Sequence, residues 1–91
     1  MSDTLERTVL IENRRGLHAR ASAKFVTLAS AQAAAIEVAK DGSSVAGTSI
    51  MGLMMLGAAK GDTITISCSG KDADQALAAL CGLVENKFGE E

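Results

Sequence analysis

The sequence contains no tryptophan, tyrosine or proline, and only two phenylalanines among its 91 residues. Nucleic-acid binding relies on stacked aromatic rings and on clustered lysine and arginine, whereas this chain has a net charge of −2 and no basic stripe. It also lacks an apolar run of about 20 residues and the basic-then-apolar layout of a signal peptide. We therefore expect a cytoplasmic protein with no nucleic-acid partner and no membrane insertion.

Histidine and cysteine, the usual ligands of a structural metal site, are also scarce. The chain has one histidine, His18, and two cysteines, Cys68 and Cys81, which lie too far apart for a paired-ligand motif. We expect no metal and no cofactor. The cysteines are interpreted as buried, reduced thiols, with a redox pair as the alternative. The length predicts a single domain over residues 1–91.

Hydrophobic periodicity predicts seven secondary-structure elements. Asp41-Gly42 between two extended segments is typical of a type I′ hairpin turn, and the sequence from Asp72 to Gln75 is close to a helix capping box. Strands with one polar face, alternating with helices, predict an α+β domain with a mostly antiparallel sheet and its helices on one side. The expected strands cover 7–12, 36–40, 43–47 and 63–69, and the expected helices cover 19–35, 50–57 and 73–88.

His18 directly precedes the first expected helix, and Arg20 lies in the first turn of that helix. The opening amides of a helix have no internal partner and lie at its positive end, so they bind anions readily. A guanidinium matches phosphate oxygens, and a neutral imidazole is a good nucleophile near pH 7. These residues together could form a phosphoryl pocket. The alternative is that His18 only caps the helix and Arg20 is a surface charge.

Several segments in succession resemble one known family. The segment 16–20 reads Gly-Leu-His-Ala-Arg and is followed by Phe25-Val26. Together they are similar to the active-site segment of HPr, the histidine-containing phosphocarrier of the phosphoenolpyruvate phosphotransferase system. The segment 49–57 is similar to the second signature of that family, and 61–66 with Gly70 also fits. The resemblance covers roughly residues 7–88.

This resemblance implies a fold and a role. The fold is an open-faced β-sandwich, βαββαβα, with four antiparallel strands in spatial order 1-4-2-3 and three helices on one face. His18 would accept phosphate at Nδ1 from phosphohistidine on Enzyme I and pass it to Enzyme IIA proteins. Arg20 and the backbone amides of Ala19 and Arg20 would hold the phosphate. Such a protein is a stoichiometric intermediate and not an independent catalyst, and we expect a monomer.

The chain departs from the family pattern at two positions. Many members have proline after the active-site arginine, where this chain has Ala21; proline would pre-set φ, so the rigidity of that turn is in question. Arg15 replaces a residue that is often small and polar. Its side chain could add positive charge near the phosphate or could be solvated, and we favour solvation.

The second signature carries a regulatory expectation. Ser49 suits a helix N-cap, and it also matches the serine that HPr kinase/phosphorylase modifies in part of the family. Helical spacing allows Ile50, Met51 and Met54 to be partly exposed, and the resemblance implies that partners dock there. Two alternatives stay open: Ser49 is only an N-cap, and the short helix is packed in the core.

Two other functions remain in competition with sugar-linked phosphate transfer. The chain could act in a regulatory branch that phosphorylates a nitrogen- or carbon-signalling IIA protein and feeds no sugar permease. It could instead be an unrelated small acylphosphatase. That enzyme needs an asparagine to position water, and neither Asn13 nor Asn86 has a convincing context for this role.

Overall fold

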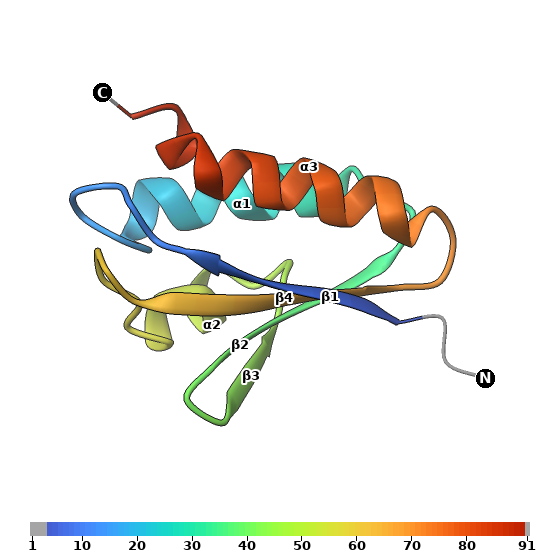
Figure 1. Ribbon diagram of the computed structural model, residues 1–91, viewed down its shortest axis with the longest axis horizontal. Helices are drawn as coiled ribbons and strands as arrows, with labels where there is room; N and C mark the ends of the chain where they lie inside the picture. The colour runs from blue at the N-terminus through green and yellow to red at the C-terminus, as the bar shows by residue number, and fades with distance from the viewer. Residues whose placement is uncertain (1–3, 91) are drawn as a thin grey trace.

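A four-stranded antiparallel sheet forms one layer of the computed structural model, which describes residues 4–90 (Figure 1). Its strands are β1 (Leu5–Leu10), β2 (Ala35–Lys40), β3 (Ser43–Ala46) and β4 (Thr63–Ser69), in spatial order β1-β4-β2-β3. The central strand β4 pairs with β1 on one side and β2 on the other. Its alternate residues Ile64, Ile66 and Cys68 are buried. The predicted antiparallel sheet and its strand order are confirmed.

Strands β2 and β3 form the hairpin that Asp41-Gly42 predicts. Both turn residues have positive φ, +51° at Asp41 and +85° at Gly42, as the type I′ turn requires. The register pairs Lys40 with Ser43 and Val38 with Val45. The hairpin is therefore confirmed in position and in turn geometry.

Three α-helices, α1 (Ala19–Ser30), α2 (Ile50–Met55) and α3 (Ala73–Glu85), complete the open-faced sandwich. Helices α1 and α3 lie side by side over one face of the sheet, and α2 contacts α1 and β3 (Figure 1). Between helices and sheet lies one hydrophobic core, which matches the predicted α+β fold. Its largest buried apolar side chains are Ile11, Phe25, Val38, Leu53, Ile64, Ile66, Leu80, Val84 and Phe88.

Several predicted boundaries were wrong. The first helix ends at Ser30 and not near residue 35, although the intervening residues favour helix, because Ala35 already pairs with Ser69 in the sheet. The first strand covers Leu5–Leu10 and not 7–12. Helix α3 ends at Glu85, and Phe88 enters the core from the short 3₁₀ turn η1 (Lys87–Gly89).

The predicted capping box at the start of α3 was also wrong. Asp72 occupies the N-cap position, but its backbone is left-handed, with φ +56°, and its side chain makes no capping hydrogen bond. An N-cap that accepts from the helix amides normally has extended backbone. The left-handed conformation at Asp72 removes that geometry, so α3 begins without the reciprocal pair.

Residues 4–90, which the structure describes, contain neither a candidate membrane span nor a candidate metal cluster. No helix there is both long and apolar enough to span a bilayer. No group of three or more histidine, cysteine or acidic residues gathers in a way that could hold a metal ion. Cys68 and Cys81 are both free and buried, and burial raises the pKa of each thiol.

Candidate functional site

The loop from residue 11 to 18 brings His18 to the start of α1, and Gly16 is the residue that allows its path. Gly16 has φ +63°, and a Cβ built on it would lie 2.3 Å from the carbonyl oxygen of Ala58. The amide of Leu17 donates to that same oxygen across 2.9 Å. Only glycine combines this conformation with so close a backbone approach. The loop is thereby fixed against the segment that follows α2.

His18 is the N-cap of α1. Its backbone is extended, with φ −75° and ψ −179°, and its carbonyl accepts the first helical hydrogen bond, from Ser22, at 2.9 Å. The amide of Arg20 donates to Nδ1 of the imidazole ring across 3.3 Å. A ring nitrogen that accepts a hydrogen bond carries no proton. The lone pair of Nδ1 therefore faces the free amides at the positive end of α1.

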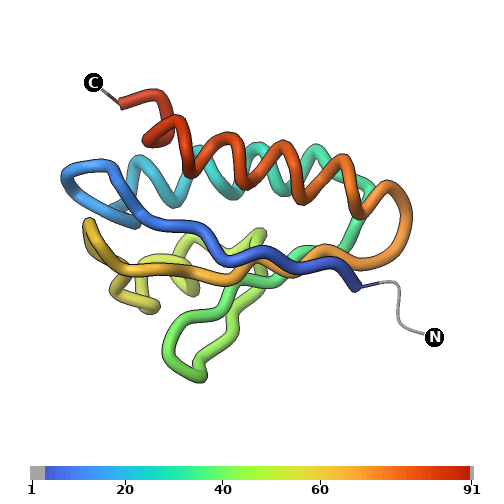
Figure 2. The backbone as a smooth tube through the Cα atoms, viewed as in Figure 1, coloured from blue at the N-terminus to red at the C-terminus, as the bar shows by residue number. Residues whose placement is uncertain are grey.

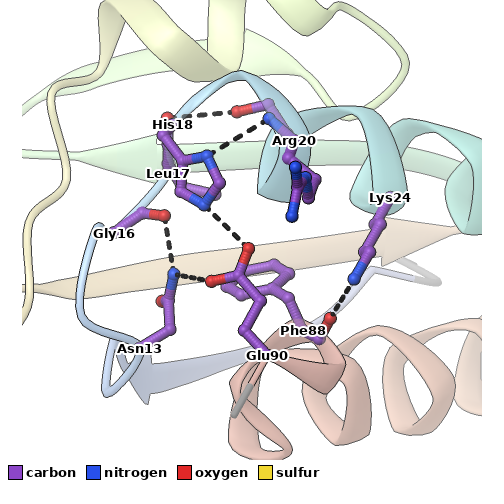
Figure 3. Close-up of polar contacts among 9 residues, drawn as sticks. Asn13, Gly16, Leu17, His18, Arg20, Lys24, Phe88 and Glu90 are labelled. Carbon is purple, nitrogen blue, oxygen red and sulfur yellow. Dashed lines mark hydrogen bonds and ion pairs between the residues drawn. The ribbon is translucent and has the colours of Figure 1, made fainter.

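The other ring nitrogen is bound by a carboxylate. Nε2 of His18 lies 2.8 Å from Oε2 of Glu90, and each side chain is about one-sixth exposed. The second oxygen of Glu90 accepts from Nδ2 of Asn13 at 3.2 Å, and Nδ2 also donates to the carbonyl of Gly16 at 2.8 Å (Figure 3). In the neutral ring, Nε2 is the nitrogen that carries the proton, because Nδ1 accepts.

The contacts of Glu90 lower its pKa. Burial of the carboxyl group acts in the opposite direction and raises the pKa. The hydrogen bonds from Asn13 and His18, with the positive charge of Lys24, outweigh it and hold the pKa of Glu90 below its ordinary value of 4.5. Glu90 is therefore ionised at neutral pH and faces the imidazole as an anion.

His18 and Glu90 open onto a surface cleft of about 510 Å³. Arg14, Arg15 and Arg20 line it together with Lys24 from the second turn of α1. Four cations around one carboxylate make this cleft suited to a further anion. His18 and Arg20 are thus brought together, as predicted. Arg15 is exposed to solvent, and it lines the same cleft as His18.

Helix α1 begins at Ala19, and its first turn lacks the proline that the resemblance to HPr led us to compare. Ala21, which stands at that position, is fully buried in the first turn. Ser22 adds a hydrogen bond from its hydroxyl to the carbonyl of Leu17, at 3.2 Å. Packing of Ala21 and this hydrogen bond stabilise the turn in place of a fixed proline φ.

Ser49 and the exposed apolar residues lie on a different element, α2. Ser49 is the N-cap of that helix, since its hydroxyl accepts from the amide of Gly52 at 3.0 Å, which confirms the predicted capping role. Leu53 is fully buried, whereas Met51 is 70% exposed. We define the exposed set as the methionine patch: Ile50, Met51, Met54 and Met55. Met55, at 81% exposure, was not predicted.

The sequence reasoning missed Asn13, Lys24 and Glu90 as members of the site. Lys24 donates to the carbonyl of Phe88 at 2.8 Å and ties α1 to η1. Glu90 lies 72 positions from His18, and no motif links them. Asn13 lies in the polar loop that precedes His18, and this position is the sequence signal that could have identified it. The structure shows that Asn13 is fully buried there.

Comparison with known proteins places this geometry in a family. Residues 5–86 match the family described as "PTS HPr component phosphorylation site". The chain is 44% identical to the phosphocarrier protein HPr of Cupriavidus necator, over 94% of this chain and 97% of the relative. It is 46% identical to the phosphocarrier protein NPr of Shewanella violacea, over 94% of each chain.

Solved structures agree with the sequence relatives. The crystal structure of HPr-C-His from Thermoanaerobacter tengcongensis superposes with a TM-score of 0.91 at 46% identity, covering 96% of this chain and 98% of that one. A structure of an HPr dimer from the same organism has a TM-score of 0.76 at 45% identity, covering 90% and 94%. That relative is a dimer, so the monomer expected for this chain stays a prediction. The sequence, the fold and the cleft at the start of α1 show together that the chain belongs to the HPr family of phosphocarrier proteins.

Proposed function

We propose that this chain carries a phosphoryl group on Nδ1 of His18, taken from Enzyme I and passed to Enzyme IIA proteins. The observation that carries the proposal is the orientation of the imidazole: Nδ1 accepts from the Arg20 amide, at the start of α1, on the wall of a cleft with four cations. A nucleophilic lone pair therefore lies where an incoming phosphate would meet amide donors and a guanidinium.

The chemistry is an exchange of one P–N bond for another. The lone pair of Nδ1 attacks phosphorus, and the bond between phosphorus and the donor's histidine breaks, with its electron pair returning to that ring. The amides of Ala19 and Arg20, with the Arg20 guanidinium, would stabilise the negative oxygens of the group in transit. The helix holds these amides in place before the donor docks, so they need little reorganisation.

Radiolabelled phosphoenolpyruvate and Enzyme I provide the direct test. We expect phosphate on the wild-type chain that is labile in acid and stable in base, which is the behaviour of phosphohistidine. His18→Ala should carry none. Arg7→Ala, a charge change on β1 at a residue that pairs with Glu85, serves as the control and should be labelled normally. An acid-stable label alone, retained in His18→Ala, would contradict the carrier role.

We further propose that α2 provides the docking and control surface. Enzyme I would bind against the methionine patch, because flexible methionine side chains suit contact with several partners. HPr kinase/phosphorylase would modify Ser49, and a phosphate at this N-cap would add about two negative charges beside the docking surface. Slower transfer to His18 would follow from repulsion of an acidic partner face.

A role in a regulatory branch is the second candidate function. The chain is 46% identical to a protein named NPr and 44% identical to one named HPr, so sequence identity does not favour the sugar branch. Both candidates use the same phosphohistidine. They differ in the acceptor, so the phosphorylated chain should be offered in parallel to a sugar-permease IIA domain and a nitrogen- or carbon-signalling IIA protein. The acceptor with the higher second-order rate constant identifies the branch.

A further inference from the structure

We propose that Glu90 is a positioning residue for phosphoryl transfer: its carboxylate holds the proton on Nε2 of His18 and balances the positive charge that the ring acquires when Nδ1 takes the phosphate. The inference rests on the proposed carrier function. It adds a residue from the far end of the fold, 72 positions from His18, to a site otherwise built from the start of α1.

The two nitrogens of the His18 ring have different partners. Nδ1 accepts from the Arg20 amide on one edge of the ring, and Nε2 contacts Glu90 on the other edge (Figure 3). A phosphate on Nδ1 would therefore not need the place that Glu90 occupies. With the proton on Nε2, the lone pair is left on the nitrogen that faces the amides.

The chain holds Glu90 in place through an unusual turn. Lys87, Phe88 and Gly89 all have positive φ, +56°, +56° and +72°, and the first two are not glycines. Such conformations cost free energy and persist only where the surroundings stabilise them. Phe88 provides that stabilisation, because its ring is buried in the core and its carbonyl accepts from Lys24. In Figure 2 the turn after α3 lies beside the loop that leads to His18.

Glu90 is held at both oxygens. Asn13, which is fully buried, donates to Oε1 while His18 contacts Oε2, so the carboxylate cannot rotate away without losing both partners. These hydrogen bonds also lower the pKa of Glu90 and keep it ionised at neutral pH. An oriented anion against the distal imidazole nitrogen is the arrangement that stabilises an imidazolium in other histidine chemistry.

Phosphoryl transfer to Nδ1 changes the charge of the His18 ring. Nδ1 forms the new P–N bond, the donor's histidine leaves with the electron pair of the old one, and Nε2 retains its proton. The ring is then cationic, and Glu90 lies against it. A cationic ring is also the better leaving group when phosphate moves on to the acceptor. Loss of Glu90 should therefore slow both transfers.

The single histidine makes a spectroscopic test direct. In chain labelled with ¹⁵N-histidine, only His18 contributes ring signals. In the unphosphorylated wild type at neutral pH, we expect a visible one-bond correlation between Nε2 and its proton, protected by Glu90. Glu90→Ala should lose this correlation to solvent exchange. Glu90→Gln, whose amide oxygen still accepts, should retain it. Glu12→Ala, at an exposed position in the loop before His18, should match the wild type.

Transfer rates complete the experiment. We expect Glu90→Ala to lower the second-order rate constant of phosphorylation by Enzyme I about tenfold, with Glu90→Gln in between, since a hydrogen bond to a charged group is lost or weakened. An unchanged Nε2 correlation in Glu90→Ala, or faster phosphorylation of that variant, would overturn the proposal. If the wild type took no phosphate at all, the carrier function would fail, while the ring spectrum would still report whether Glu90 sets the proton position.

Discussion

The amide nitrogen of Arg20 lies 3.3 Å from Nδ1 of His18, so the residue that supplies the guanidinium also orients the ring through its backbone. The two contributions are separable by mutation, because a side-chain change leaves the amide in place. An arginine side chain at the positive end of a helix is otherwise unfavourable. The phosphate that we propose on His18 would reverse that electrostatic cost.

Truncation of Arg20 should therefore reduce phosphate transfer without disturbing the ring. We expect Arg20→Ala to lower the second-order rate constant for phosphorylation by Enzyme I by about 10- to 100-fold, because a charge-assisted, forked donor is lost in the transition state. Arg20→Lys should recover part of the loss, since it keeps the charge but not the fork. Single-turnover quench kinetics provide the measurement. A rate equal to wild type in Arg20→Ala would rule out the guanidinium as a phosphate ligand.

Gly16 offers a test of how the loop is held. Gly16→Ala combines a positive φ with a Cβ placed 2.3 Å from the Ala58 carbonyl, and should lower the free energy of unfolding by about 3–5 kcal/mol. Gly57→Ala is the matched control, because Gly57 also has positive φ but no atom lies within 4 Å of its built Cβ. It should cost only about 1–2 kcal/mol. Urea denaturation of both variants gives the comparison, and equal losses would mean that the loop is not packed as described.

Local signals in the sequence were sufficient for much of the fold. Asp41-Gly42 predicted the hairpin because only a few residue types tolerate two positive φ angles in succession. The alternation of Ile64, Ile66 and Cys68 predicted a half-buried strand, which the structure shows between β1 and β2. His18 at the expected start of a helix, with Arg20 two positions later, predicted the location of the site. The resemblance to HPr then favoured phosphoryl transfer as its chemistry.

Local sequence patterns could not predict the features that depend on tertiary contacts. The alanine-rich segment after Ser30 favours helix locally, yet Ala35 pairs with Ser69, and strand pairing overrides propensity. The path that brings Glu90 to His18 depends on three left-handed residues, which no hydrophobic period reveals. Asp72 occupies the N-cap position that its sequence pattern predicted. Its backbone is left-handed, however, and its side chain makes no capping hydrogen bond.

A substitution at Met51 tests partner docking without disturbing the hydrophobic core. Because its side chain is 70% exposed, Met51→Asp should change the free energy of unfolding by no more than about 0.5 kcal/mol. It should weaken binding to Enzyme I at least about tenfold, or about 1.4 kcal/mol, by placing a charge in an apolar contact. Leu10→Asp, an exposed apolar position on β1, is the control and should bind normally. Isothermal titration calorimetry gives both affinities, and unaltered binding by Met51→Asp would move the docking surface elsewhere.

The lowered pKa of Glu90 predicts an acid-dependent loss of stability. The folded pKa lies below the ordinary value of 4.5, so in acid the unfolded chain binds more protons than the folded one. Wild type should be more stable than Glu90→Gln above that value, and the advantage should shrink as pH falls through the lowered folded pKa. Urea denaturation of both proteins between about pH 6 and pH 3 measures the difference. A difference independent of pH would contradict the ionised contact.

Ser49→Asp should slow phosphorylation of His18, and the slowing should weaken as salt is added. An aspartate can still cap α2 as the Ser49 hydroxyl does, so the helix should persist while a negative charge is added beside the methionine patch. Surface charges lose most of their interaction beyond about 10 Å at 0.1 M salt, so repulsion of an acidic partner should be greatest at low ionic strength. Ser43→Asp adds the same charge at an exposed position in β3 and should have little effect. Equal rates of transfer from Enzyme I for wild type and Ser49→Asp at matched low salt would show that Ser49 acts only as the cap of its helix.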